Sequence, residues 1–412
     1  MNLRFPSLFK IYFCAVVGLV FLMPISQLLS TRLLFILFIF SFFLNPNTTV
    51  LRSSIIFSWD IFVYLAIVII GILYSFDLSQ SIKVLETNFS FLAIPLVLKT
   101  LRLNSKKIEL LFFGYLYGLS LASFICLFNA LFSFVENGNV NSFFYYNLTE
   151  PIGFQPTYFA YYISFGICLS LYLIYTDQIK IKRHLFTINI IFLFIILMLA
   201  ASRTAYVGLL FILSFFVLKF LFNNSLKSHR YVAILSSFLL FAMLLINHYN
   251  WNDSRTDSGS GTDYWERFPL WQAALRANPN PLFGVGTGDY KAVLNQYYSQ
   301  QGMKSFATDS YNSHNQFVQI YFSNGILGLL ILCILICRPL YLSFIVQNQL
   351  GIIIIFPFII YGITEVFLGR FQGIIFFVFC HQLVITDSCL RRPKLIPVGK
   401  KQQVNDALHF KL

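Results

Sequence analysis

The chain has 412 residues, of which 58% are hydrophobic, 18% are aromatic and only 11% are charged, and its formal net charge is +13. Because soluble globular chains carry about a quarter charged residues, this composition excludes a soluble enzyme, a secreted disulfide-stapled domain and a disordered chain. It predicts an all-α polytopic membrane protein embedded in the lipid bilayer. The positive charge is typical of Lys and Arg retained on the cytoplasmic side of a membrane and does not indicate nucleic-acid binding.

Apolar runs along the chain predict about 12 transmembrane helices. Polar stretches divide the sequence into helices 1–9 (residues 1–249), a long loop (250–315), helices 10–12 (316–386) and a basic tail (387–412). The predicted spans are 8–29, 33–44, 55–74, 83–98, 108–135, 157–175, 185–201, 205–222, 231–249, 316–337, 349–366 and 371–386.

The distribution of Lys and Arg predicts the orientation of these spans. With the N-terminus in the cytoplasm, most of the 29 Lys and Arg residues fall in short cytoplasmic connections and in the tail. Both termini are then cytoplasmic, and the long loop lies on the outer side of the membrane. The cations left on the outer side are Arg32, Lys83, Arg203, Arg255, Arg267, Arg276, Lys291, Lys304 and Arg370.

The loop at 250–315 is too long for a simple connection, so we expect it to carry function. Asp263, with an acidic residue three positions later, predicts a helix start, and the helix is expected over 264–277. A second short helix is expected from 289 to about 299. The Gly-Val-Gly-Thr-Gly run at 284–288 lacks the Lys and Ser or Thr of a nucleotide loop. We interpret it as a tight turn and a candidate backbone anion nest.

Two outer arginines are candidate phosphate ligands, because a planar guanidinium donates paired hydrogen bonds to phosphate oxygens. Arg203 lies in the short turn Ser202-Arg203-Thr204-Ala205 between two spans, at the depth of a lipid-linked phosphate. Arg267 lies on the first loop helix, one turn before Trp271. The alternatives are an interfacial arginine that reaches water for Arg203, and an exposed intrahelical ion pair for Arg267.

His314 and Asn315 stand at the start of the tenth span, followed by Gly325 and Gly328 in the pattern His-Asn-x9-Gly-x-x-Gly. His314 is a candidate proton acceptor or donor near neutral pH, with an ordinary interfacial polar side chain as the alternative. The two glycines are expected to permit close helix packing in lipid. No spacing in the loop is typical of a metal site, so neither a metal nor a cofactor is expected.

Glu365 and Arg370 flank the last outer turn. They either form an ion pair that lines the site or anchor the ends of two spans. Together with Asn315 and Trp271, they are possible site-lining residues.

The arginine turn, the loop with "NPLFGVGTGDY" and the His-Asn-x9-Gly-x-x-Gly pattern together resemble the O-antigen ligase-like family over roughly residues 185–340. This family contains O-antigen ligases, O-antigen polymerases and bacterial protein O-oligosaccharyltransferases, and its fold is similar to GT-C-type membrane glycosyltransferases. The resemblance implies that Arg203 and Arg267 hold the diphosphate of a lipid-linked donor and that His314 is the catalytic base. It also implies that the reaction is metal-independent.

We therefore expect a membrane glycosyltransferase that moves a glycan from undecaprenyl diphosphate to an acceptor hydroxyl, favoured as an O-antigen ligase acting on lipid A–core. The alternatives within the family are a polymerase, whose acceptor is a growing glycan, and protein O-glycosylation. A polysaccharide transporter or flippase is disfavoured, because the charges inside the spans are few (Asp60, Glu86 and Glu109) and the polar residues gather in one loop.

Overall fold

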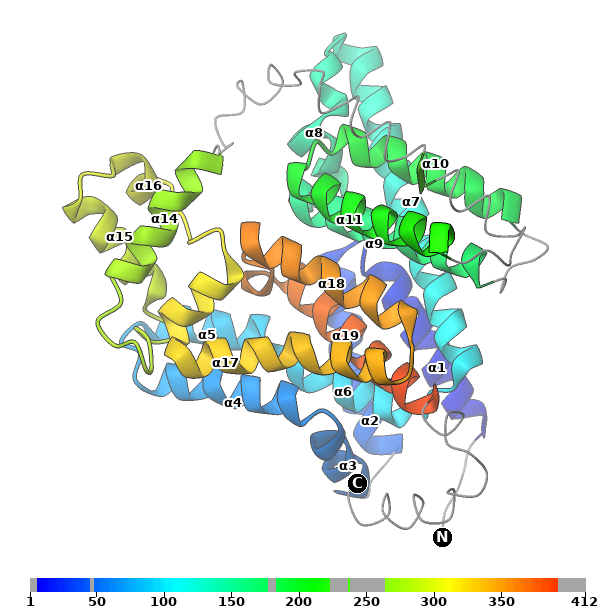
Figure 1. Ribbon diagram of the computed structural model, residues 1–412, viewed down its shortest axis with the longest axis horizontal. Helices are drawn as coiled ribbons and strands as arrows, with labels where there is room; N and C mark the ends of the chain where they lie inside the picture. The colour runs from blue at the N-terminus through cyan, green and yellow to red at the C-terminus, as the bar shows by residue number, and fades with distance from the viewer. Residues whose placement is uncertain (1–5, 45–47, 177–182, 223–235, 238–263, 392–412) are drawn as a thin grey trace. The chain divides into compact units, whose positions relative to one another are not determined.

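The computed structural model describes residues 6–44, 48–176, 183–222, 236–237 and 264–391. All regular elements in these residues are helices, which confirms the predicted all-α class (Figure 1). The α-helices are α1 (Pro6–Leu22), α2 (Gln27–Leu44), α3 (Thr48–Phe57), α4 (Trp59–Leu73), α5 (Leu78–Thr87), α6 (Phe89–Thr100), α7 (Ser105–Asn137), α8 (Tyr145–Thr149), α9 (Pro156–Tyr175), α10 (Arg183–Leu199), α11 (Arg203–Phe222), α14 (Tyr264–Arg276), α15 (Tyr290–Gln300), α16 (Lys304–Thr308), α17 (Gln316–Ile345), α18 (Gln349–Thr364) and α19 (Phe371–Arg391). The 3-10 turns are η1 (Val140–Phe143), η2 (Glu150–Ile152) and η5 (Phe367–Gly369).

Six helices in the described residues are long and apolar enough to cross a membrane, or seven if the pair α3 and α4, bent by 91°, is one span. Shorter apolar helices accompany them. The structure is thus consistent with a multi-pass membrane protein, whereas the number of twelve spans stays a prediction. The ninth predicted span, at 231–249, lies almost wholly outside the described residues.

The predicted boundary between the first two spans is wrong. The chain turns at residues 23–26, so the first helix is shorter than the predicted 8–29 and the second is longer than the predicted 33–44. Pro24 lies in this turn, and proline lacks the N–H that the next helical hydrogen bond requires. Hydropathy does not reveal the turn, because the residues beside Pro24 are as apolar as the helices they join.

The chain divides into two compact units, which are described separately. One consists of Val17–Ser30 and Glu109–Gly261, and in it α9 packs against α10 and α11 with nearly all of its residues buried. The other consists of Met1–Val16, Thr31–Ile108 and Thr262–Leu412. In this second unit α17 packs against α4, α18 and α19, and α19 packs against α6 (Figure 1).

The described part of the long loop has a small hydrophobic core of its own. Both predicted helices are present as α14 and α15, and α14 ends before the Asn-Pro-Asn-Pro stop; Asp263, its predicted cap, lies outside the described residues. The short helix α16 was not expected, because five residues show no helical periodicity. The core joins these helices to the first half of α17 through the buried side chains Leu270, Ala273, Ala274, Leu294, Tyr298 and Phe322. The loop is therefore anchored on α17.

The prediction of an anion nest at residues 284–288 is wrong, because each backbone N–H of this segment already has an acceptor. The N–H groups of Gly284, Val285 and Gly286 bind the carbonyls of Asn280, Phe322 and Ser323, respectively. The Thr287 N–H binds the Gly71 carbonyl, and the Gly288 N–H binds Ser75 Oγ. The segment fastens the loop to α4 and α17 and has no amide left for an anion.

Gly325 interrupts α17 with a φ of 64° and a ψ of −162°. A Cβ atom at Gly325 would lie 2.2 Å from the Leu282 carbonyl oxygen, so only glycine fits there without displacing the backbone. The predicted close packing therefore occurs between α17 and the 281–289 segment rather than between two membrane helices.

Candidate active site

His314 lies directly before α17, between the short helix α16 and the first turn of the long helix. Its backbone φ is 43°, in the left-handed region that side chains other than Gly, Asn, Asp and His rarely adopt. Asn315 follows as the N-cap, and its Oδ1 accepts hydrogen bonds from the N–H groups of Phe317 and Val318. The buried Asn315 thus fixes the start of the helix, and this start fixes the position of His314.

Glu365 brings Arg267 and His314 together within the unit that contains the loop. Its Oε1 lies 3.5 Å from Arg267 Nη2, and its Oε2 lies 3.4 Å from His314 Nδ1. The three side chains are only 10%, 14% and 18% exposed for Glu365, Arg267 and His314, respectively. A carboxylate buried to this degree is costly unless cations or donors accompany it, which these two groups provide.

Three chain segments hold this cluster in place. Arg267 stands on α14, whose buried face packs on the loop core, and His314 precedes α17. Glu365 is the C-cap of α18, and its N–H binds the Tyr361 carbonyl at 2.7 Å. The turn after Glu365 is tied to α17, because the Leu368 N–H donates to Gln316 Oε1 at 2.7 Å.

The geometry of the cluster suits proton transfer beside a positive charge. Both contacts of Glu365 are longer than the 2.7–2.9 Å of a tight charge-assisted hydrogen bond, and the His314 contact lacks hydrogen-bond geometry. Catalytic contacts are often loose before substrate binds and tighten afterwards. Glu365 lies beside the imidazole, and Arg267 presents a cation within the same cluster.

Trp271 adds a hydrogen-bond donor on the same helix as Arg267. Its indole Nε1 is buried and has no hydrogen-bond acceptor among the described residues. A buried indole N–H normally has a partner. Because Trp271 follows Arg267 by one helical turn, its free donor is available to a substrate that reaches Arg267.

Arg370 does not form the ion pair with Glu365 that was one of its two predicted roles, since Glu365 faces Arg267 and His314 in the described structure. Arg370 is exposed directly before α19. Its charge acts instead on Tyr290 and Lys291 of α15.

Arg203 is the first residue of α11 and belongs to the other compact unit. The turn before it contains Ala201 with a φ of 49°, and Arg203 itself is half-buried. A cation at a helix N-terminus is opposed by the positive end of the helix dipole. Its position is therefore poor for helix stability but suited to an anion, which the arginine and the helix end would both attract.

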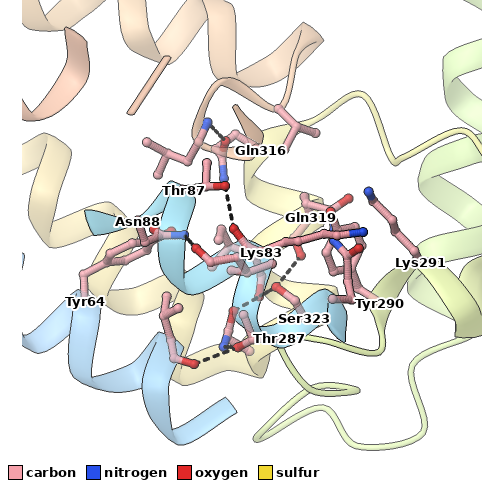
Figure 2. A pocket seen from close by; sticks show the side chains of 18 residues that line it. Tyr64, Lys83, Thr87, Asn88, Thr287, Tyr290, Lys291, Gln316, Gln319 and Ser323 are labelled. Atoms are coloured by element: carbon pink, nitrogen blue, oxygen red, sulfur yellow. Dashed lines mark hydrogen bonds between the residues drawn. The ribbon is translucent and has the colours of Figure 1, made fainter. Parts of the chain in front are cut away.

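Sequence reasoning missed a cavity of about 240 Å³ beside this cluster, formed by α4, α5, α15, α17 and the η5 turn (Figure 2). Lys83 and Lys291 line the cavity; both are among the cations predicted on the outer side, and neither had a predicted role. They are distant in the chain, and only the packing of the loop onto α17 brings them to one cavity.

Comparison with known proteins agrees with the resemblance found in the sequence. Residues 188–333 match the family described as O-antigen ligase (Wzy_C), a range that includes Arg203, Arg267 and His314. The chain is also similar to an uncharacterized protein of Haemophilus influenzae, with 22% identity over 240 residues, which are 52% of this chain and 59% of that protein. Residues 188–333 of the chain are thus similar to the O-antigen ligase family.

Proposed function

We propose that the protein transfers a glycan from undecaprenyl diphosphate to an acceptor hydroxyl, acting as an O-antigen ligase on lipid A–core without a metal ion. The observation that supports this proposal most directly is the buried cluster in which Glu365 contacts both Arg267 and His314. The matched O-antigen ligase domain supports the reaction class.

In the proposed reaction the acceptor oxygen attacks C1 of the donor sugar, and the bond between C1 and the diphosphate oxygen breaks. His314 takes the proton from the acceptor hydroxyl. The departing diphosphate gains negative charge, which Arg267 stabilises; Arg203 is proposed as a second diphosphate ligand. Direct attack inverts the configuration at C1.

We place the long loop on the periplasmic side of the inner membrane and both termini in the cytoplasm. This orientation is supported by the short basic connections and the basic tail, which the reverse orientation would translocate. A lipid-linked glycan and its lipid-anchored acceptor would then meet at the outer surface of the bilayer, where the loop lies.

A transport function is less well supported. Asp60, an acidic residue buried in α4, is already in contact with Arg338 and His381, whose Nε2 lies 2.9 Å from Asp60 Oδ2. A satisfied ion cluster of this kind stabilises the packing of α4, α17 and α19. The hydrogen-bond donors that suit a lipid-linked glycan substrate lie instead in and beside the loop.

Deletion of the gene tests the function through the glycans of the cell envelope. For a ligase we expect lipid A–core without attached polysaccharide, together with accumulated long lipid-linked glycan. The wild-type gene should restore lipid A–core that carries the polysaccharide. Lipid A–core that carries a single repeat unit of the glycan would instead indicate a polymerase. Unchanged lipopolysaccharide with altered glycoproteins would show protein glycosylation.

Glu365 is a positioning residue in this mechanism, and its charge is the property to test. Glu365→Gln keeps the size of the side chain but removes the charge that orients His314 and Arg267. We expect about a tenfold loss of kcat with little change in KM, and partial recovery in Glu365→Asp. Initial rates of purified protein measure this effect. Glu150→Gln, which alters an exposed carboxylate in η2, is the matched control. Wild-type kcat in Glu365→Gln would exclude the positioning role.

A further inference from the structure

The cavity beside the His314 cluster contains polar groups that the proposed reaction does not use. Its walls come from α4, α5, α15, α17 and the η5 turn (Figure 2). Its volume of about 240 Å³ lies below the ~300–1,000 Å³ of pockets for drug-sized ligands. This size suits one sugar ring. The polar residues that line it include Lys83, Asn88, Tyr290, Lys291, Gln316 and Gln319.

Three cations gather at one side of this cavity. Lys83 of α5 and Lys291 of α15 line it, and Arg370 acts on Lys291 from the start of α19. None of the three forms an ion pair with a carboxylate in the described part of the chain. Partial burial lowers the pKa of the Lys291 ammonium, and the charges of Lys83 and Arg370 lower that pKa further. The like charges oppose one another here, so an anion in the cavity would relieve their repulsion.

The neighbouring tyrosine reports the same electrostatic environment. Burial raises the pKa of Tyr290 to about 12, while the Arg370 charge opposes the rise. Tyr290 therefore stays protonated at neutral pH and presents a hydroxyl, not a further anion, to a ligand. In Figure 2 the side chains of Tyr290, Lys291 and Lys83 lie on the same side of the cavity.

Two buried amides at the cavity each have one polar atom without a hydrogen-bond partner among the described residues. Gln316, 1% exposed, uses Oε1 to accept from the Leu368 N–H, but its Nε2 has no acceptor. Asn88, 4% exposed, uses Nδ2 to donate to the Val84 carbonyl, but its Oδ1 has no donor. A buried polar atom left without a partner costs about 1–3 kcal/mol. A ligand with hydroxyl groups would satisfy both atoms.

Residues that line the cavity are close in the chain to those of the candidate active site. Gln316 follows His314 by two residues, and the Leu368 N–H that it binds lies three residues after Glu365. Gln316 and Leu368 thus connect the wall of the cavity to the segments that carry His314 and Glu365.

We propose that this cavity is a subsite for one acidic sugar of the substrate glycan, with Lys83 and Lys291 binding its carboxylate or phosphate and Gln316 and Asn88 bonding its hydroxyl groups. The assignment of the ligand to a substrate glycan rests on the proposed function. The binding chemistry itself rests on the cavity alone.

Binding of monosaccharides to the full-length protein in nanodiscs tests the proposal. The probes are methyl glucuronide, glucose 6-phosphate, methyl glucoside and inorganic phosphate, and titration calorimetry measures each Kd. We expect both acidic sugars to bind at least tenfold more tightly than methyl glucoside and inorganic phosphate, with affinity falling as salt is added. Equal binding of methyl glucoside would overturn the role of the charge, and equal binding of inorganic phosphate would overturn the role of the sugar.

Variants assign the binding to this cavity. The double variant Lys83→Gln/Lys291→Gln is expected to weaken binding of methyl glucuronide at least tenfold, and Asn88→Ala several-fold. Lys304→Gln, which removes an exposed cation on α16, is the matched control and should bind as the wild type does. Wild-type affinity in the double variant would place the sugar elsewhere. Displacement of methyl glucuronide by farnesyl diphosphate would assign the site to the lipid carrier and contradict the proposal.

His314→Asn separates this proposal from the proposed function. If both are correct, this variant loses glycan transfer but retains the affinity for methyl glucuronide. Full transfer by His314→Asn would refute the proposed mechanism and leave the binding result standing. Loss of sugar binding in this variant would contradict a separate subsite.

Discussion

Replacement of His314 is expected to abolish glycan transfer while the protein still inserts and folds. Removal of a general base typically costs about 10²–10⁴ in rate. His314→Asn is the sharpest variant, because Asn tolerates the left-handed backbone found at this residue but has no imidazole to accept a proton. Initial rates with a lipid-linked glycan donor and a purified acceptor measure the loss, both with and without EDTA.

Two further measurements make the His314 result specific. His184→Ala, which removes an exposed imidazole on α10, should leave the rate unchanged. The thermal unfolding of His314→Asn in detergent should match that of the wild type, since Asn315 still caps α17. If the variant retains wild-type rates, His314 is an interfacial polar residue and the reaction uses another base.

Loss of Arg267 is the second large effect that we expect. Arg267→Ala removes the cation beside Glu365, so the departing diphosphate loses its stabilising charge, and a fall of about 10²–10³ in kcat is expected. Arg267→Lys should recover part of the rate, because it keeps the charge but not the planar pair of donors. Arg276→Ala changes an exposed arginine on the same helix and is the control.

Stability and activity must be distinguished for Arg267, because its removal leaves Glu365 buried with one cation fewer. Breaking a buried ion pair costs about 3–5 kcal/mol. The double variant Arg267→Gln/Glu365→Gln removes both charges and should recover the thermal stability lost in Arg267→Gln, but not the activity. Recovered activity in the double variant would show that Arg267 only balances the charge of Glu365.

Some parts of the site could be predicted from local sequence. His314 and Arg267 belong to short patterns, a helix start and a helix face, that neighbouring residues define. Charge also made Arg267 a candidate, because few cations remain on the outer side once the basic connections are assigned to the cytoplasm. Glu365 was only a possible member of the site, since nothing near it in the chain reveals that its carboxylate reaches α14 and the start of α17.

The glycine-rich segment shows where local patterns misled. A Gly-x-Gly-x-Gly run has the backbone freedom for an anion nest, and sequence alone offers no competing acceptors for its N–H groups. In the fold, carbonyls of α4 and α17 and the Ser75 hydroxyl take these hydrogen bonds. Packing of the same segment also explains why residue 325 is glycine. The sequence predicted that Gly325 allows close helix packing in lipid, whereas in the fold the absence of a side chain leaves room for the Leu282 carbonyl.

The sequence by itself determined the helical membrane class, the two short helices of the loop and three candidate site residues, because hydropathy, helical periodicity and spacing are local properties. Only the tertiary structure decided that Glu365 joins Arg267 to His314, that the glycine-rich segment is an anchor, and that Lys83 and Lys291 line one cavity. These features depend on how the loop packs onto α17. The packing of distant segments follows from the shape of a shared core, and no short pattern in the chain encodes that shape.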